Sequence, residues 1–294
     1  MRIVSLVPAA TEIVAALGAG SDLVGISHEC DYPPSVQHLP RVTSTPIDRA
    51  LAGGTIDAEV RRLVDKGRPV FTVAADELRR LAPDLLLTQS LCEVCAVSEG
   101  TVSRLAAALS PAPAVVALDG RTVGGIFEDI RRVSAVLGLA DEAEELIAGL
   151  EWRLRQLGGQ RTEGPRPRVV CVEWLEPLYL AGHWVPELVT AAGGHDVGAS
   201  AGRHSERREW HEVRSLSPDL VLVMLCGFDV ERTRRELAAL QDADARALLE
   251  RTPTWIVDGN AYTSRSGPRV VDGAERMHAA LAGRTMPGLE RWRE

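Results

Sequence analysis

Two short apolar runs of this chain are each preceded by the same turn-forming phrase. The sequence LAPDLLL covers residues 81–87 and LSPDLVL covers residues 216–222, so that Pro83 and Pro218 correspond at a distance of 135 positions. In each copy a helical segment gives way through Pro-Asp to a run of Leu and Val, which is typical of a strand buried on both faces in a parallel sheet. The loop after such a strand lies at the carboxyl edge of the sheet, where open α/β sheets bind their ligands.

The repeat also includes the segments that precede each phrase. Residues 2–5 (RIVS) and 168–171 (RVVC) both have the composition of a strand. A helical pattern follows each of them, over residues 11–17 and 186–192, and ends in a glycine-containing turn that supplies a positive φ. The repeat predicts two related α/β lobes, each beginning with a strand, a loop and a helix. The alternative is that Leu-x-Pro-Asp-Leu is common before any buried strand and indicates no duplication.

The segment between the two parts, residues 121–159, has the periodicity of two helices. Apolar residues recur there at helical spacing, first as Ile126, Ile130, Val133 and Leu137, and then as Leu146, Leu150, Leu154 and Leu157. Asp141 and Glu144 form a plausible capping pair at the start of the second helix. At about 1.5 Å per residue its roughly 18 residues would span about 27 Å, enough to bridge two lobes as a stiff strut and limit hinge motion.

We therefore predict an α/β protein of two Rossmann-like lobes with a ligand cleft between them. The N-terminal lobe covers residues 1–120, the interlobe helical segment residues 121–160 and the C-terminal lobe residues 161–294. A chain of 294 residues is long enough for two domains with separate cores.

Composition and charge exclude some classes of protein. The chain is 45% hydrophobic and 25% charged, which is ordinary for a globular protein. A net charge of −8 and a pI near 5.5 argue against nucleic acid as a partner, because phosphate neutralisation needs a basic surface. No run of 18 apolar residues predicts a membrane span. Met1 leads directly into a strand without the features of a signal peptide, so we expect a cytoplasmic location with reduced cysteines.

Several motifs are similar to those of one protein family. The opening RIVSLVPAATE (residues 2–12), the Leu-x-Pro-Asp-Leu phrase, the long helix between lobes and DGNAY (residues 258–262) resemble the helical-backbone class of periplasmic binding proteins. This class includes the cobalamin- and iron-siderophore-binding components of ABC importers. The signatures SHECDYP (residues 27–33), LCEVCAV (residues 91–97) and CGF (residues 226–228) are similar to its cobalamin-binding group.

This resemblance covers nearly the whole chain, and it implies a two-lobed binding protein that holds a small metal-containing ligand in its cleft. The implied ligand is cobalamin or another corrinoid. The components of importers are exported or lipidated, whereas this chain shows no export signal. A partnership with an ABC permease is therefore not supported by the N-terminus.

Four of the five cysteines follow predicted strands and are expected at the cleft; they are Cys30, Cys92, Cys95 and Cys226. Four thiolates, or three with a histidine, suit zinc or an iron–sulfur cluster. This favours an alternative function, a cytoplasmic metalloprotein with a redox or metal-trafficking role. A single C-x-x-C is weaker evidence than two, and two other interpretations compete: small packing residues, or a redox pair formed by Cys92 and Cys95. Cys171 lies inside a strand pattern and is expected in the core.

Aromatic residues make up only 4% of the chain, yet many follow predicted strands or lie in loops. Flat rings offer a large rigid contact area to a macrocycle such as a corrin. A neutral ring nitrogen of His183 or His28 can coordinate the metal of such a ligand. The predicted ligand-binding residues are Pro8, His28, Trp174, His183, Trp184, Trp210, Phe228 and Tyr262. The alternative is that the rings fill the lobe cores and that the histidines are hydrogen-bonding loop residues.

Signatures of catalysis are missing from the sequence. It has no G-x-S-x-G elbow, no P-loop, no H-E-x-x-H motif and no dinucleotide-binding glycine pattern after the first strand. We therefore expect a binding protein rather than an enzyme, and leave open only a redox activity of a cysteine-bound metal centre.

Overall fold

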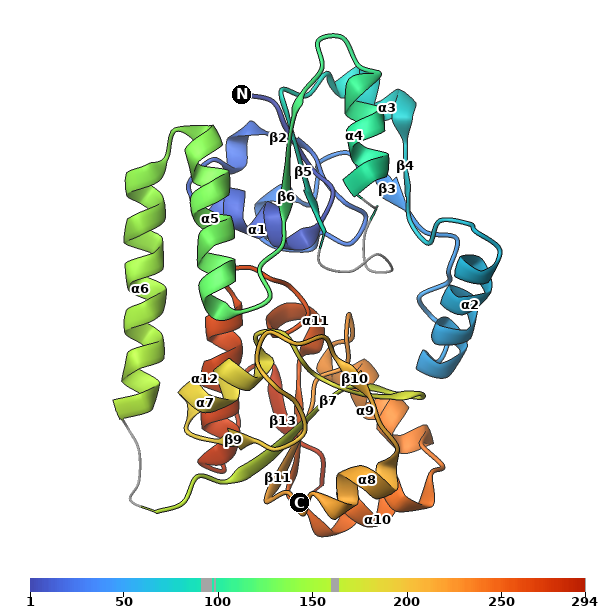
Figure 1. Cartoon of the computed structure of the whole chain (residues 1–294), viewed down its shortest axis with the longest axis vertical. Coiled ribbons are helices and arrows are strands. Elements are labelled where there is room, and N and C mark those ends of the chain that lie inside the picture. Colours follow the sequence, from blue (N-terminus) through green and yellow to red (C-terminus); the bar gives the residue numbers. More distant parts are fainter. Residues whose placement is uncertain (91–96, 98, 160–163, 294) are drawn as a thin grey trace.

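The computed structural model describes residues 1–90, 97, 99–159 and 164–293. Two α/β lobes lie one above the other and are joined along one side by a pair of long helices (Figure 1). This architecture confirms the predicted fold class. Within the described residues no helix is long and apolar enough to cross a membrane.

The first lobe contains a four-stranded parallel sheet of order β2-β1-β5-β6. Its strands are β1 (Ile3–Ser5), β2 (Leu23–Gly25), β5 (Leu85–Gln89) and β6 (Ala114–Leu118). Helices α1 (Pro8–Ala16), α3 (Ala75–Leu81) and α4 (Glu99–Ala107) belong to this lobe, together with short 3-10 turns at Gly20–Asp22 and Pro34–Val36. Helix α1 begins at Pro8, three residues before the predicted helical pattern, because proline is well accommodated in a first helical turn.

The second lobe is built on a larger, mixed sheet of order β10-β8-β7-β11-β12-β13, with β9 paired to β7. Its strands are β7 (Arg168–Leu175), β8 (Leu178–Leu180), β9 (His195–Asp196), β10 (Glu206–Arg207), β11 (Leu220–Val223), β12 (Thr254–Val257) and β13 (Leu289–Arg291). The central strands are parallel, whereas β8, β10 and β13 pair antiparallel to their neighbours. Its helices are α7 (Val185–Ala192), α8 (Trp210–Ser215), α9 (Val230–Ala239), α10 (Ala243–Arg251), α11 (Gly259–Tyr262) and α12 (Val270–Leu281).

The repeated phrase has the same local structure in both lobes. Ala82 in the first copy and Ser217 in the second have left-handed backbones, with φ of 42° and 47°. The aspartate that follows accepts a hydrogen bond from the backbone N–H of the arginine that starts the neighbouring strand, at 2.7 Å for both Asp84 with Arg2 and Asp219 with Arg168. The same arginine side chains donate to carbonyls at the end of the preceding helix. The phrase therefore joins a helix end to two parallel strands.

Two antiparallel helices connect the lobes, α5 (Val123–Leu137) and α6 (Ala140–Gly159). Thr122 caps α5 by accepting the N–H of Gly125 at 3.0 Å, and Gly138 ends it with φ of 72°. Helix α6 packs against α5 and also against α7 and α12 of the second lobe. Its first residue is Ala140, so Asp141 lies inside the first turn rather than at the cap. Acidic side chains there favour the positive end of the helix dipole.

One continuous apolar core runs through both lobes on the side of these helices. It extends from Ile3 and Ile13 of the first lobe, through Ile126 and Ile147, to Leu188 of the second. A core shared in this way resists separation of the lobes on the α5–α6 side and supports the expectation of limited hinge motion.

A second connection crosses on the opposite side of the molecule. The short strands β3 (Thr43–Ser44) and β4 (Thr72–Val73) pair antiparallel, and between them residues 45–71, here called the strap, leave the first lobe. The strap carries helix α2 (Gly53–Asp65), which reaches toward the second lobe (Figure 1). The sequence patterns gave no indication of this element.

Candidate ligand-binding cleft

A cavity of about 780 Å³ lies between the lobes. Residues just after β1, β5 and β11 line it, including Pro8, Ser90 and Cys226. These positions are the carboxyl ends of parallel strands, where α/β folds place their ligands. The strap adds a further wall with Ile47, Ile56 and other residues. The volume falls within the range of about 300–1,000 Å³ that is usual for small-molecule sites.

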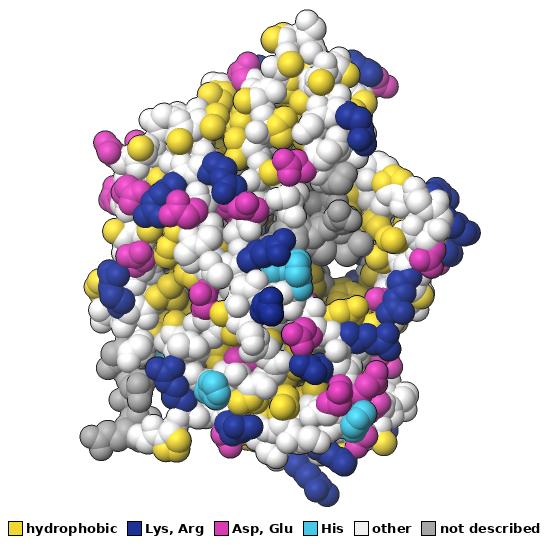
Figure 2. All heavy atoms as spheres, viewed as in Figure 1, with side chains coloured by type: hydrophobic (Ala, Val, Ile, Leu, Met, Phe, Trp, Pro, Cys, Tyr) yellow, Lys and Arg dark blue, Asp and Glu magenta, His cyan; other side chains and the backbone are white. Residues whose placement is uncertain are grey.

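Aromatic and aliphatic side chains form much of the cavity wall. Trp174 and Phe228 meet at 5.3 Å between ring centroids with tilted planes, and both line the cavity together with Phe71 and Trp184. The buried Nε1 atoms of Trp174 and Trp184 have no hydrogen-bond partner among the described residues. Figure 2 shows a hollow beside the strap, with hydrophobic side chains gathered at its edge. Such a wall suits a ligand with flat apolar faces and a few polar groups.

His183 is held in this wall by a strained loop. Its φ is 54°, which is left-handed, and its backbone N–H donates to the carbonyl of Arg203 at 2.6 Å. The preceding Gly182 has no room for a side chain, because a Cβ there would lie 2.5 Å from the Arg203 oxygen. A non-glycine residue in this backbone region costs about 1–3 kcal/mol and often marks a functional site. The loop therefore fixes the imidazole in one place.

The His183 ring is a neutral imidazole. Burial lowers the pKa of His183 to about 4, with further lowering by His204 and Arg121. Its Nε2 is buried and has no hydrogen-bond partner among the described residues. The His204 ring lies edge-on at 5.3 Å, and its own Nε2 is 3.1 Å from the Arg121 guanidinium, which can only donate. The ring of His183 is thus neutral at physiological pH and has an unused nitrogen.

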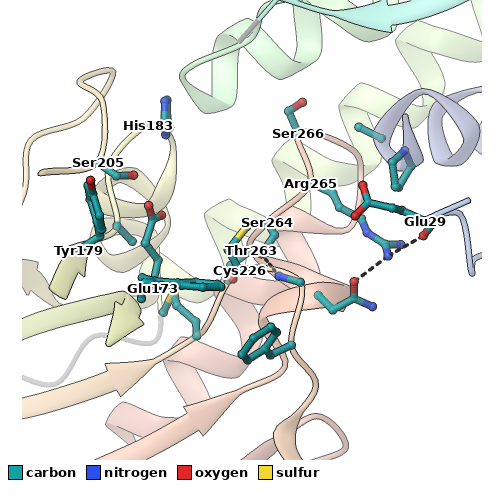
Figure 3. Close-up of a pocket in the computed structure, with 18 of the residues that line it drawn as sticks. Glu29, Glu173, Tyr179, His183, Ser205, Cys226, Thr263, Ser264, Arg265 and Ser266 are labelled. Atoms are coloured by element: carbon teal, nitrogen blue, oxygen red, sulfur yellow. Dashed lines mark hydrogen bonds between the residues drawn. The ribbon is translucent and has the colours of Figure 1, made fainter. Parts of the chain in front are cut away.

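The opposite side of the cavity carries a charged cluster that joins the lobes. Arg265 of the second lobe donates to Glu12 at 2.8 Å and to Asp31 at 2.6 Å, both in the first lobe. Asn260 donates to the same aspartate at 2.7 Å. Figure 3 shows Arg265, Ser266 and Glu29 on one side of the cavity and His183 and Ser205 on the other. The two sides therefore present different chemistry to a ligand.

Burial controls protonation in this cluster. It raises the pKa of Glu12, an effect that the charge and hydrogen bond of Arg265 partly offset. Burial also raises the pKa of Glu29, against the charges of Arg49 and Arg265. For Asp31, burial acts in the same direction, but the hydrogen bonds and charge of Arg265 outweigh it and the pKa is lowered. Asp31 is therefore the firmest anionic partner of Arg265.

Six of the predicted residues line the cavity: Pro8, Trp174, His183, Trp184, Cys226 and Phe228. They come from strand ends and loops of both lobes, as the topology of equivalent strands predicts. Tyr179, Ser205 and Arg121 line it as well.

Three other residues predicted to bind the ligand, His28, Trp210 and Tyr262, do not line the cavity, so their predicted position at the cleft is wrong. His28 sits behind Phe71 at 5.6 Å between rings, and its Nδ1 contacts Thr43 at 2.6 Å. Trp210 starts α8 and is buried in the core of the second lobe. Tyr262 packs under Arg276, whose guanidinium lies 3.6 Å from the ring centroid. Trp210 therefore belongs to a lobe core and Tyr262 packs within its lobe, while His28 is a hydrogen-bonding loop residue, which was the alternative for the histidines.

The cysteines do not meet at one place within the described part of the chain. Cys30 is 1% exposed in the first-lobe core, with its Sγ 3.1 Å from the hydroxyl of Thr11, and burial raises its pKa to about 11. Cys226 is exposed at the cavity. Cys92 and Cys95 lie outside the described residues. Over the rest of the chain no group of three metal-binding side chains is present, and Cys171 is buried in β7.

Sequence reasoning missed three features of the site. Glu29 belongs to the SHECDYP segment (residues 27–33) and follows a predicted strand, so its position at the cleft could have been predicted from the sequence. Arg265 follows the quoted DGNAY segment, but its partners in the first lobe are more than 230 positions away. The strap residues Arg49 and Ile56 lie in a segment without strand or cleft signals.

Comparison with known proteins adds to this geometry. The sequence profile of a family described as "Periplasmic binding protein" matches residues 3–256. A "Cobalamin-binding protein" of Halobacterium salinarum is 23% identical over 294 residues, covering 97% of this chain and 70% of that protein. A "Vitamin B12-binding protein" of Vibrio cholerae is 23% identical over 283 residues, covering 94% of this chain and 87% of that protein.

Solved structures share the fold. A periplasmic heme binding protein from Pseudomonas aeruginosa superposes with a TM-score of 0.74 at 20% identity, covering 99% of this chain and 97% of the other. The periplasmic vitamin B12 binding protein of Vibrio cholerae gives a TM-score of 0.67 at 19% identity, covering 96% of both chains. At these identities the likeness to solved structures establishes the fold alone.

Proposed function

This chain belongs to the periplasmic binding protein family, and we propose that it binds cobalamin or another corrinoid in the cleft between its lobes. It is a solute-binding protein of the kind that takes cobalamin, haem or iron-siderophore-like ligands, and not an enzyme. The finer assignment to a corrinoid rests on the site and on the names of the relatives that match nearly the whole chain.

The observation that carries the proposal is His183. His183 lines the cavity as a neutral imidazole on a strained loop, and its unpartnered Nε2 is buried, so a turn of the ring brings this nitrogen to one axial position of a metal inside a flat macrocycle. Trp174 is partly exposed and offers the flat contact surface that such a ring needs, backed by the buried Phe228, whereas Trp184 is 4% exposed in the core beside His183. Arg265, paired with the buried Glu12 and the more exposed Asp31, provides polar contacts on the opposite side.

The test is a spectral titration of the purified protein with hydroxocobalamin, whose exchangeable axial position responds to a new nitrogen ligand. We expect saturable binding with a shift of the visible bands, and His183→Ala should abolish the shift. His211→Ala, which removes an exposed histidine on α8, is the matched control and should behave as the wild type. A wild-type protein that binds without any His183-dependent shift would contradict axial coordination.

Haem is the second candidate, because Arg121 and Arg49 both line the cavity and either can meet a ligand carboxylate. The same titration with hemin distinguishes the two ligands. If the protein binds corrinoids, hydroxocobalamin should bind more tightly than hemin. The comparisons give no support to an iron–sulfur cluster. The cytoplasmic location remains a proposal, which cell fractionation would test.

A further inference from the structure

The strap forms one wall of the cavity but is only narrowly attached to its own lobe. Residues 45–71 leave and return through β3 and β4, which pair over two positions, Thr43 with Val73 and Ser44 with Thr72. One further backbone bond, from Ala74 to Val42 at 2.9 Å, extends this base. A segment of this length on such a base can move about it without disturbing the four-stranded sheet.

The far end of the strap is tied to the second lobe by two side chains of α9. Arg232 donates to the carbonyl of Leu51 at 2.5 Å and also to that of Arg49. Glu236 accepts the N–H of Gly53 at 3.0 Å, at the start of α2. The two are themselves an ion pair at 3.9 Å. These contacts, with the packing of Ile56 against the second-lobe core, close the strap across the cleft.

These contacts of Arg232 and Glu236 with the strap, here called the tie, adjoin the cavity wall. The Arg232 guanidinium lies 3.8 Å from the centroid of Phe228, which lines the cavity. The strap itself supplies Ile47, Ile56 and Phe71 to the opposite part of the wall. Helix α2 crosses from the first lobe to the second (Figure 1), and only Gly53 and Leu63 of that helix are buried. Among the described residues the strap is therefore a loosely packed wall of the site.

The lobes, by contrast, are fixed to each other elsewhere. The shared core on the α5–α6 side and the buried pair of Arg265 with Glu12 join them. Breaking a buried charge cluster costs more than releasing hydrogen bonds at a partly exposed edge. A ligand that needs more room to enter thus meets least resistance at the strap.

We propose that the strap is the gate of the cavity and that Arg232 and Glu236 are positioning residues that hold it closed. The role as a ligand gate rests on the proposed function. Opening of the strap would let a ligand enter and leave without separation of the lobes. Loosening the tie should therefore raise the association and dissociation rate constants together and change their ratio less.

Stopped-flow kinetics with hydroxocobalamin, and in parallel with hemin, test the gate. We expect Arg232→Ala and Glu236→Gln each to raise both rate constants at least threefold. Arg235→Ala and Glu231→Gln are the matched controls, because they change exposed side chains of the same helix and should leave both rates unchanged. Rates in Arg232→Ala equal to those of Arg235→Ala would overturn the proposal.

A readout without any ligand keeps this test separate from that of the proposed function. In a background carrying Cys92→Ser and Cys95→Ser, labelling of Cys226 by a small and by a bulky maleimide reports access to the cavity. Arg232→Ala should speed the bulky reagent more than the small one, and amide hydrogen exchange at Gly53 and Ile56 should rise. If neither probe binds the wild type, the proposed function fails while faster bulky labelling still supports the strap as a gate. Unchanged labelling and exchange would refute the gate itself.

Discussion

Removal of Arg265 should be among the most damaging single substitutions in this chain. The guanidinium is 6% exposed and Glu12 is 2% exposed, and the two lie 2.8 Å apart, with Asp31 at 2.6 Å on the other side. Arg265→Ala leaves two carboxylates without their main partner, and Glu12 Oε2 already lacks a hydrogen bond among the described residues. Breaking a buried pair from one side costs about 3–5 kcal/mol, which is a large part of the roughly 5–15 kcal/mol that stabilises a typical protein.

Urea denaturation followed by tryptophan fluorescence gives the measurement. With a slope of about 2 kcal/mol/M, the loss corresponds to a midpoint lower by about 1.5–2.5 M. Arg80→Ala is the control, since its pair with Glu77 at 2.5 Å is on the surface and should contribute no more than about 1 kcal/mol. A double-mutant cycle with Glu12→Ala should give a coupling energy of about 2 kcal/mol or more. A loss below about 1 kcal/mol for Arg265→Ala would refute the view that the Arg265–Glu12 pair is desolvated and locks the lobes.

Three further outcomes are expected. Burial lowers the pKa of His183 from 6.5 to about 4. The spectral shift of bound hydroxocobalamin should therefore stay constant from pH 8 to near 5 and disappear as the pH falls through the folded-state pKa. In absorbance titrations, loss of the shift centred near pH 6.5 would contradict this. Gly182→Ala should displace the His183 loop and destabilise the protein by about 1–3 kcal/mol in urea, while Gly149→Ala, with open space around it on α6, should be neutral or stabilising by up to about 1 kcal/mol. Cys30→Ser should leave metal content unchanged by elemental analysis and cost about 1 kcal/mol; metal loss equal to that of Cys92→Ser would restore the shared cysteine site.

Periodicity and turn chemistry were sufficient to predict the lobes and the helices between them. The phrase around Pro83 and Pro218 is local, since the left-handed residue, the aspartate and the buried run are adjacent in the sequence. Helices α5 and α6 were equally accessible, because Ile126 and Leu150 recur at helical spacing. The strap was not predicted, because its conformation depends on contacts with Arg232 and Glu236, far away in the sequence.

The site was predictable where it follows strand ends and unpredictable where it depends on packing. Trp174 lies near the end of β7, and His183 and Phe228 lie in the loops after β8 and β11, so topology placed them. Trp210 and Tyr262 also follow such elements, but their rings turn into the lobe. Pattern alone does not give the direction of a side chain.

The most direct test of the account is anomalous X-ray diffraction at the cobalt edge, from crystals of the protein grown with hydroxocobalamin. We predict one cobalt peak per chain, between the lobes and within coordination distance of a ring nitrogen of His183, with the corrin against Trp174. A peak elsewhere on the molecule, or a cleft without cobalt at saturating ligand, would contradict corrinoid binding in this cleft.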